Sequence, residues 1–286
     1  MSAIALVGPV AGMLGHDYMR HALLAGTFIA VAAGLAGHFV VLRNQVFTGD
    51  ALSHVAFTGS LGGYAAGIQP LVGLYVATVG AAVGMGSLGG RARSRDVVIG
   101  TVFAWVLGVG VLFLSIYTTA RSSGNGAAGV NVLFGSIYGI GLAQAITAAV
   151  VASCVAAAVL LLGRPLLLAS IDPDVAAARG VPVRLVGLAF LALVGITVGE
   201  ATQAVGALLI VGLLVTPAAT AQRLTARPFR ALALAAGIAV GCVWLGLFLA
   251  YVTPRVPPSF AIVGLAFTGY LAATVVSRRR SPLGRA

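Results

Sequence analysis

The sequence has 286 residues, of which 60% are hydrophobic and 8% are charged, and its mean hydropathy is +1.07. This composition excludes a soluble globular domain, because the surface of such a domain would not tolerate so much apolar side chain. The net charge is +11, yet the basic residues are all arginines scattered between apolar runs. This scatter argues against nucleic acid as a partner and indicates topology signals of an all-α membrane protein embedded in a lipid bilayer.

Apolar runs follow one another along almost the whole chain. At about 20 residues for each bilayer crossing, they predict about nine transmembrane helices, within a range of eight to ten. Short loops join the runs, so we expect one transmembrane domain over 1–286 and no separate soluble domain. The runs lie at about 21–42, 49–67, 69–90, 96–118, 132–163, 183–200, 202–224, 229–252 and 259–277.

The first run contains His38. A lone histidine within a membrane helix is most often a hydrogen-bonded packing residue. It could instead contribute to a metal pathway if the first two runs pack against each other. The sequence is consistent with both interpretations.

The second run begins with a carboxylate and an imidazole, those of Asp50 and His54. Four-residue spacing places both side chains on one helix face, about one turn apart. Ionisable groups at bilayer depth cost about 3 kcal/mol on insertion scales, so the pair indicates a function. The alternative is that Asp50 caps the helix start and that His54 hydrogen-bonds a backbone carbonyl.

A carboxylate with a neutral imidazole suits Zn²⁺ or Mn²⁺, whereas Mg²⁺ and Ca²⁺ prefer oxygen ligands throughout. Two ligands make a weak site, and a conduction path requires such weakness because a complete tetrahedral cage would hold the ion too long. Asp50 and His54 therefore predict passage of a divalent metal.

Arginines mark alternate connections between the runs. Arginine-rich connections are retained on the cytoplasmic side, so this alternation predicts a multi-pass protein of the plasma (inner) membrane with the N-terminus outside and the C-terminus in the cytoplasm. The arginines concerned are Arg43, Arg91, Arg93, Arg95, those from Arg164 to Arg184, Arg223, Arg227, Arg230 and those from Arg278 to Arg280.

A short capped helix is predicted at about 171–181, on the cytoplasmic side. The pattern comprises an N-cap aspartate before a proline, an acid in the first turn, an alanine-rich body and a terminal glycine. A bare loop would need fewer residues, so we expect a docking element for a cytoplasmic partner, although an interfacial helix without a partner remains the alternative. The residues that carry the pattern are Asp172, Pro173, Asp174, Ala177 and Gly180.

The single glutamate of the chain, Glu200, lies where the sixth run meets the seventh, at the predicted outer end. It could attract cations at an external mouth or contact a docking protein. Alternatively, it is a solvated loop residue.

Four passages together resemble the membrane permeases of zinc and manganese ATP-binding-cassette importers, the ABC-3 family. The resemblance extends from about residue 20 to 277. The passages are Arg43 to His54 with GDALSH, Leu133-Phe134-Gly135-Ser136, IDPDVAAARGV at 171–181, and QAVGALLIVGLLVTPAATAQRL at 203–224.

The resemblance implies a homodimer, with an ATP-binding cassette subunit docked on the coupling helix at 171–181 and an extracytoplasmic metal-binding protein outside. The resemblance implies no intrinsic cofactor, because the partner subunit binds the ATP. It implies Mn or Zn as the transported ion, and Fe is a further possible substrate. Asp50 and His54 match the intramembrane acid and histidine of the family. His38 and Glu200 depart from the family pattern.

Two other functions fit the sequence less well. A proton-coupled secondary carrier of divalent metals also uses Asp/His pairs, but it usually needs a second ionisable pair on a facing helix. An enzyme is not expected, because the sequence has neither a His-Glu-x-x-His motif nor a phosphate-binding Gly-x-x-x-x-Gly-Lys loop. ATP hydrolysis is therefore expected on a separate chain.

Overall fold

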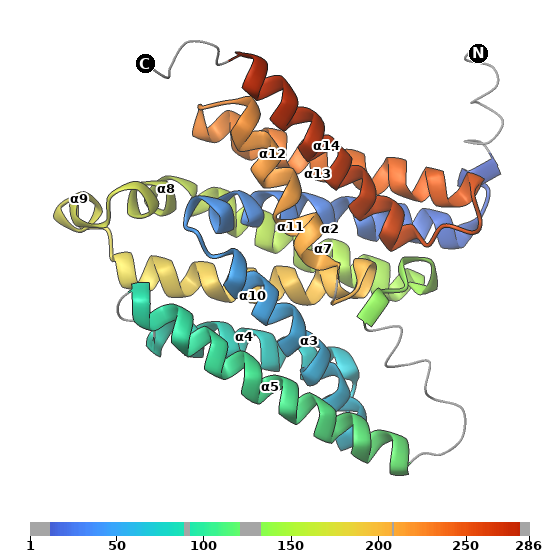
Figure 1. Ribbon diagram of the computed structural model, residues 1–286. Coiled ribbons are helices and arrows are strands. Elements are labelled where there is room, and N and C mark those ends of the chain that lie inside the picture. The colour runs from blue at the N-terminus through green and yellow to red at the C-terminus, as the bar shows by residue number, and fades with distance from the viewer. Residues whose placement is uncertain (1–11, 89–91, 121–132, 208, 281–286) are drawn as a thin grey trace.

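The computed structural model describes residues 12–88, 92–120, 133–207 and 209–280, and all secondary structure within these ranges is helical. The helices are α2 (Asp17–Leu42), α3 (Val46–Ala66), α4 (Pro70–Leu88), α5 (Ala92–Ala120), the 3₁₀ helix η1 (Ile137–Gly139), α7 (Leu142–Leu161), α8 (Gly163–Ile171), α9 (Pro173–Ala178), α10 (Val183–Val205), α11 (Ile210–Leu214), α12 (Thr216–Leu224), α13 (Pro228–Val252) and α14 (Pro258–Arg280). The all-α fold class is confirmed (Figure 1).

Seven helices in the described part of the chain are long and apolar enough to cross a membrane: α2, α4, α5, α7, α10, α13 and α14. They account for seven of the nine predicted apolar runs and confirm a multi-pass membrane bundle. The run at 49–67 forms α3, whose length suffices but whose hydropathy is lowered by Asp50, His54 and several hydroxyl side chains. The run at 202–224 is broken into shorter pieces.

The break in that run begins where α10 ends. Gly206 has a φ of +91°, a left-handed conformation that favours glycine. Its backbone lies so close to that of Phe134 and Gly135 that no Cβ would fit. Beyond it, α11 has only five residues, and α12 begins at Thr216-Pro217, where proline is tolerated in a first turn.

The residues just before α7 contact the chain where α10 ends. The Ser136 backbone N–H donates to the Gln203 carbonyl over 3.2 Å. The predicted run at 132–163 was therefore too long at its start, because α7 begins only at Leu142. Two passages that carry the family resemblance thus lie against each other in space.

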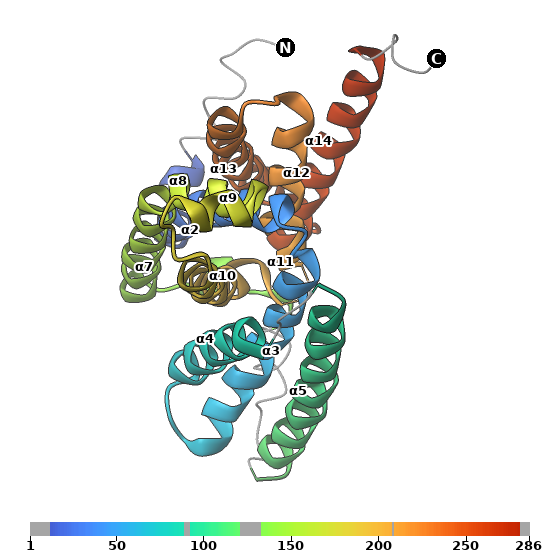
Figure 2. The same cartoon turned by 90° about the vertical axis from the view of Figure 1, so that its left-hand side faces the viewer.

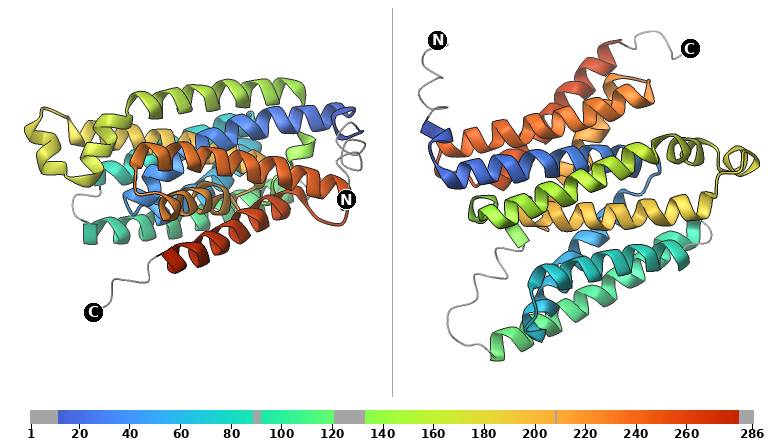
Figure 3. Two further views of the ribbon diagram at one scale, coloured as in Figure 1. Left: turned by 90° about the horizontal axis from the view of Figure 1, so that it is seen from above. Right: turned by 180° about the vertical axis from the view of Figure 1, so that it is seen from behind.

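Helix α2 is the centre of one half of the molecule, where it packs against α7, α13 and α10 (Figures 1 and 3). Small residues permit this close packing in the absence of a hydrophobic force between helices. Gly34 is an example: a Cβ at this position would lie 2.6 Å from the Ala236 Cα of α13.

Helices α3, α4 and α5 form the other half, and α10 joins the halves by packing against both α4 and α2 (Figure 2). Within this half α3 packs most extensively against α4 and α5. The packing of α3 against α4 and α5 therefore sets the positions of Asp50 and His54.

Candidate metal pathway

A tight turn places the start of α3 directly after α2. Asn44 has a φ of +52°, a left-handed conformation that asparagine tolerates better than most residues. The Gln45 N–H then donates to the Val40 carbonyl over 2.8 Å. Asp50 consequently lies in the second turn of α3 and does not cap the helix, because the N-cap position belongs to Gln45.

Asp50 and His54 lie on the partly exposed face of this part of α3. Every other residue from Thr48 to Ala56 is buried, whereas Asp50 and His54 are partly exposed. The structure thus confirms that both lie on a single helix and on its less buried face, as four-residue spacing requires.

The surroundings of the pair are mainly aromatic. The His54 ring lies edge-on to the Phe103 ring of α5, with ring centroids 5.0 Å apart. The Phe47 ring also lies beside the Phe103 ring, with centroids 6.3 Å apart. Ser53 does not bind the carboxylate, because its hydroxyl donates to the Asp50 backbone carbonyl over 2.6 Å.

Within the described residues, neither the Asp50 carboxylate nor the His54 imidazole forms a hydrogen bond or ion pair. The alternative in which His54 bonds a backbone carbonyl is therefore wrong for this conformation. Two unengaged metal-binding side chains remain on an open helix face.

The described residues give the pair no third ligand. No group of three or more His, Cys, Asp or Glu side chains that could hold a metal occurs among them. Asp50 and His54 thus offer a mobile ion two ligands, which water or another chain could supplement.

His38 is a packing residue in this structure. It is 2% exposed within α2. The Gln222 side chain of α12 donates to the His38 carbonyl over 2.9 Å, and its Nε2 lies 3.4 Å from the imidazole Nδ1. This contact joins α12 to α2 and leaves His38 outside any three-ligand group with Asp50 and His54.

Glu200 lies inside α10 and is 2% exposed, so its interpretation as a solvated loop residue is wrong. Its carboxylate accepts a hydrogen bond from the Tyr75 hydroxyl of α4 and lies 3.5 Å from the Gln203 side-chain nitrogen. In this conformation a docking protein could not reach the carboxylate, which instead joins α4 to α10.

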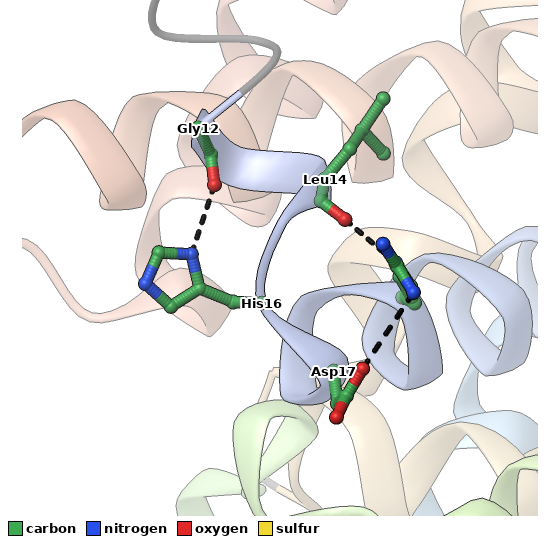
Figure 4. Close-up of polar contacts among 5 residues, drawn as sticks. Gly12, Leu14, His16 and Asp17 are labelled. Carbon is green, nitrogen blue, oxygen red and sulfur yellow. Dashed lines mark hydrogen bonds and ion pairs between the residues drawn. The ribbon is translucent and has the colours of Figure 1, made fainter.

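A polar cluster at the start of α2 is satisfied by local contacts (Figure 4). The His16 Nδ1 lies 2.9 Å from the Gly12 carbonyl oxygen. Arg20 donates to the Leu14 carbonyl over 2.6 Å and lies 3.6 Å from the Asp17 carboxylate. These exposed groups lie at the N-terminal end of α2.

The capped helix predicted at 171–181 is present as α9. The Asp172 carboxylate accepts from the backbone N–H groups of Asp174 and Val175 over 3.1 and 3.0 Å, and Pro173 begins the helix. Gly180 follows with a φ of +79°.

Helices α8 and α9 project at one end of the bundle (Figures 1 and 2). Along α9 only Ala176 is buried, whereas Asp174 and Ala177 are exposed. The preceding Ile171 is 68% exposed. An exposed, capped helix with an adjacent apolar side chain is a suitable element for contact with another protein.

Sequence reasoning missed three residues that complete these contacts: Tyr75, Phe103 and Gln222. Each comes from a helix remote in sequence from its partner, so no local spacing indicated the contact. Gln222 and Gln203 did lie within a passage that carried the family resemblance, which is the one signal that singled out their surroundings.

Comparison with known proteins agrees with the fold and the motifs. The profile of the ABC 3 transport family matches residues 15–277. The chain is 28% identical over 242 residues to the manganese transport system membrane protein MntC of Listeria monocytogenes, covering 84% of both chains. It is 27% identical over 240 residues to a probable iron transport system membrane protein of Haemophilus influenzae, covering 83% of this chain and 86% of that one.

A solved structure has the same fold. PsaBC from Streptococcus pneumoniae in complex with Fab superposes with a TM-score of 0.84 at 24% identity, covering 97% of this chain and 98% of that chain. The family match spans most of the sequence, including α3, α9 and the broken segment after α10. The chain therefore belongs to the ABC 3 transport family and is a multi-pass membrane permease.

Proposed function

We propose that this permease imports divalent manganese or zinc and that Asp50 and His54 line the path of the ion. The observation that carries the proposal is the pair itself: both side chains are partly exposed, whereas every other residue from Thr48 to Ala56 on α3 is buried. A carboxylate facing lipid would cost about 3 kcal/mol. An open face with these two groups therefore requires a polar surrounding such as a water-filled passage.

A second copy of the chain would complete the surrounding. One chain supplies two ligands, and a facing α3 would supply two more across a shared axis. Four ligands that bind the ion only weakly could accept it from outside and release it inward as the two copies rock against each other. The proposed assembly is therefore a homodimer with the path between the copies.

The choice of metal follows from ligand chemistry and from the relatives. Carboxylate and imidazole together favour Mn²⁺, Zn²⁺ or Fe²⁺ over Mg²⁺ and Ca²⁺. The two relatives described above carry manganese and iron in their names. Manganese is the first ion to test, with zinc and iron as competitors.

Membership of this family implies an ATPase and a binding protein as partners. We place the ATP-binding cassette subunit on α9, because this helix is capped, exposed and projects from the bundle. The metal-binding protein would then deliver the ion at the opposite, extracytoplasmic end. On this account ATP binding moves α9, and the motion reaches α3 through α10, which packs against both α9 and α3.

The test replaces Asp50 with asparagine in the assembled transporter. Asp50→Asn keeps the size of the side chain but removes the charge that attracts the ion, so ATP-dependent manganese uptake into proteoliposomes should fall by at least about tenfold. Asp17→Asn is the matched control, because it makes the same change at an exposed acid that forms an exposed ion pair with Arg20.

The control variant should transport at the wild-type rate. Co-purification with the ATPase should be unchanged in both variants, which separates lost transport from lost assembly. Wild-type uptake by Asp50→Asn would rule out the proposed path.

A further inference from the structure

A cavity of about 410 Å³ lies at the end of the bundle where α9 projects, and its described lining includes neither Asp50 nor His54. Five elements line it: the α2–α3 turn, the first turn of α3, the end of α4, the start of α5 and the start of α10. Figure 1 shows the starts of α5 and α10 at the same end as α8 and α9. The mouth therefore lies at the predicted cytoplasmic surface of the membrane.

Two charged side chains, those of Arg43 and Arg184, occur among the described residues that line the cavity, and both are positive. The Arg43 guanidinium is held 5.5 Å above the Phe190 ring, and a Cβ on Gly187 would lie 3.5 Å from its Nη2. One arginine is thus fixed in place, while Arg184 is exposed at the start of α10.

A buried amide in the wall lacks a partner. Gln45 is 5% exposed, and its Oε1 is buried with no hydrogen bond among the described residues. Such an atom destabilises the fold unless a ligand or water satisfies it. Thr48, 3% exposed, adds a hydroxyl to the same wall.

The described lining also includes the hydroxyl residue Ser87 and apolar side chains such as Met85, Leu188 and Leu191. A cavity with two arginines, an amide, hydroxyl groups and several apolar side chains at a membrane surface matches an amphiphile with an anionic head. Basic pockets between membrane helices on the cytoplasmic side bind anionic lipid head groups in this way. Arginine forms paired hydrogen bonds with phosphate oxygens.

We propose that this cavity binds the phosphodiester head group of an anionic phospholipid such as phosphatidylglycerol. The phosphate lies between Arg43 and Arg184, and the glycerol hydroxyls of the head group donate to the Gln45 oxygen. The lipid fills the space between the α2–α3 turn and α10, and so stabilises the arrangement of the two halves of the bundle.

The test measures lipid binding to the delipidated permease with its ATPase partner, by native mass spectrometry and by thermal shift. Phosphatidylglycerol and phosphatidylcholine with identical acyl chains are compared. Arg184→Gln should weaken phosphatidylglycerol binding about five- to tenfold and leave phosphatidylcholine unchanged. Arg164→Gln is the control, because Arg164 is an exposed arginine of α8 that lies outside the cavity lining.

A second variant gives a signature that misfolding would not produce. Gln45→Leu removes the unpaired amide, so the lipid-free protein should keep or gain thermal stability. The same variant should lose most of the stabilisation that phosphatidylglycerol gives to the wild type. Opposite changes in these two measurements would support a ligand at Gln45.

Three results would overturn the proposal. Equal phosphatidylglycerol binding by Arg184→Gln and Arg164→Gln would show that only the general surface charge matters. Displacement of the lipid by inorganic phosphate would assign the cavity to a soluble anion. Loss of the ATPase from Arg184→Gln, with lipid binding intact, would assign the arginine to the partner protein.

Discussion

Tyr75 and Glu200 form a buried contact whose strength can be isolated. The Tyr75 hydroxyl donates to the Glu200 carboxylate between α4 and α10, and the glutamate is 2% exposed. Loss of a hydrogen bond that leaves a buried polar group without a partner costs about 1–3 kcal/mol. Tyr75→Phe should therefore lower the thermal unfolding midpoint of the purified permease by several degrees.

A double-mutant cycle with Glu200→Gln tests whether the two side chains act together. Tyr75→Phe should cost less in the Glu200→Gln background, with a coupling of about 1 kcal/mol or more. Additive effects would mean that the hydrogen bond does not join the helices. The cycle is measured by thermal unfolding in one detergent, so that the surroundings stay fixed.

Gly34 and Gly241 offer a matched pair for testing helix contact. A Cβ at Gly34 would lie 2.6 Å from the Ala236 Cα and 2.7 Å from the Ala235 carbonyl oxygen. Gly34→Ala should therefore separate α2 from α13 and destabilise the permease by about 1–3 kcal/mol. Gly241→Ala has nothing within 4 Å and should be neutral or stabilising, because alanine favours a helix. Equal thermal midpoints for the two variants would contradict this packing.

At the level of helices, the cap of α9 can be separated from its charge. The Asp172 side chain accepts two backbone N–H groups, a cap that asparagine also provides and alanine does not. Asp172→Ala should cost α9 about 1 kcal/mol of local stability and reduce co-purification of the ATPase. Asp172→Asn should retain the partner, and loss of the ATPase from both variants would show that the carboxylate charge is required instead.

The helices show what sequence could and could not predict. Long apolar runs predicted the spans, and the Asp-Pro-Asp pattern predicted α9, because length and capping are local properties. The break after α10 was not predicted, since it depends on Gly206 meeting the Phe134–Gly135 backbone from a remote segment. The paired positions of Asp50 and His54 followed from spacing alone.

The environments of His38 and Glu200 could not be predicted in the same way. Each side chain is buried by partners far away in the sequence, Gln222 in one case and Tyr75 in the other. Residue type alone allowed a ligand, a packing residue or a loop residue at these positions. Only the tertiary packing distinguished them.

For the whole molecule, the distribution of arginines predicts the orientation in the membrane. Cytoplasmic connections retain arginine, so the C-terminus should face the cytoplasm and the N-terminus the outside. Green fluorescent protein fused after residue 286 should fluoresce, and an alkaline phosphatase fusion at the same place should be inactive. The reverse pattern would invert the path and place α9 outside, where no ATPase could reach it.

An ATP-driven importer and a proton-coupled carrier differ in the energy source that they use. The energy source of metal uptake is therefore the most direct test of the proposed function. The measurement is manganese uptake by proteoliposomes that hold the permease, its ATPase and its binding protein, without a proton gradient. Uptake by the ATP-driven importer should require ATP and should be lost in Asp50→Asn. Uptake that requires a proton gradient and proceeds without the ATPase would contradict the proposed function.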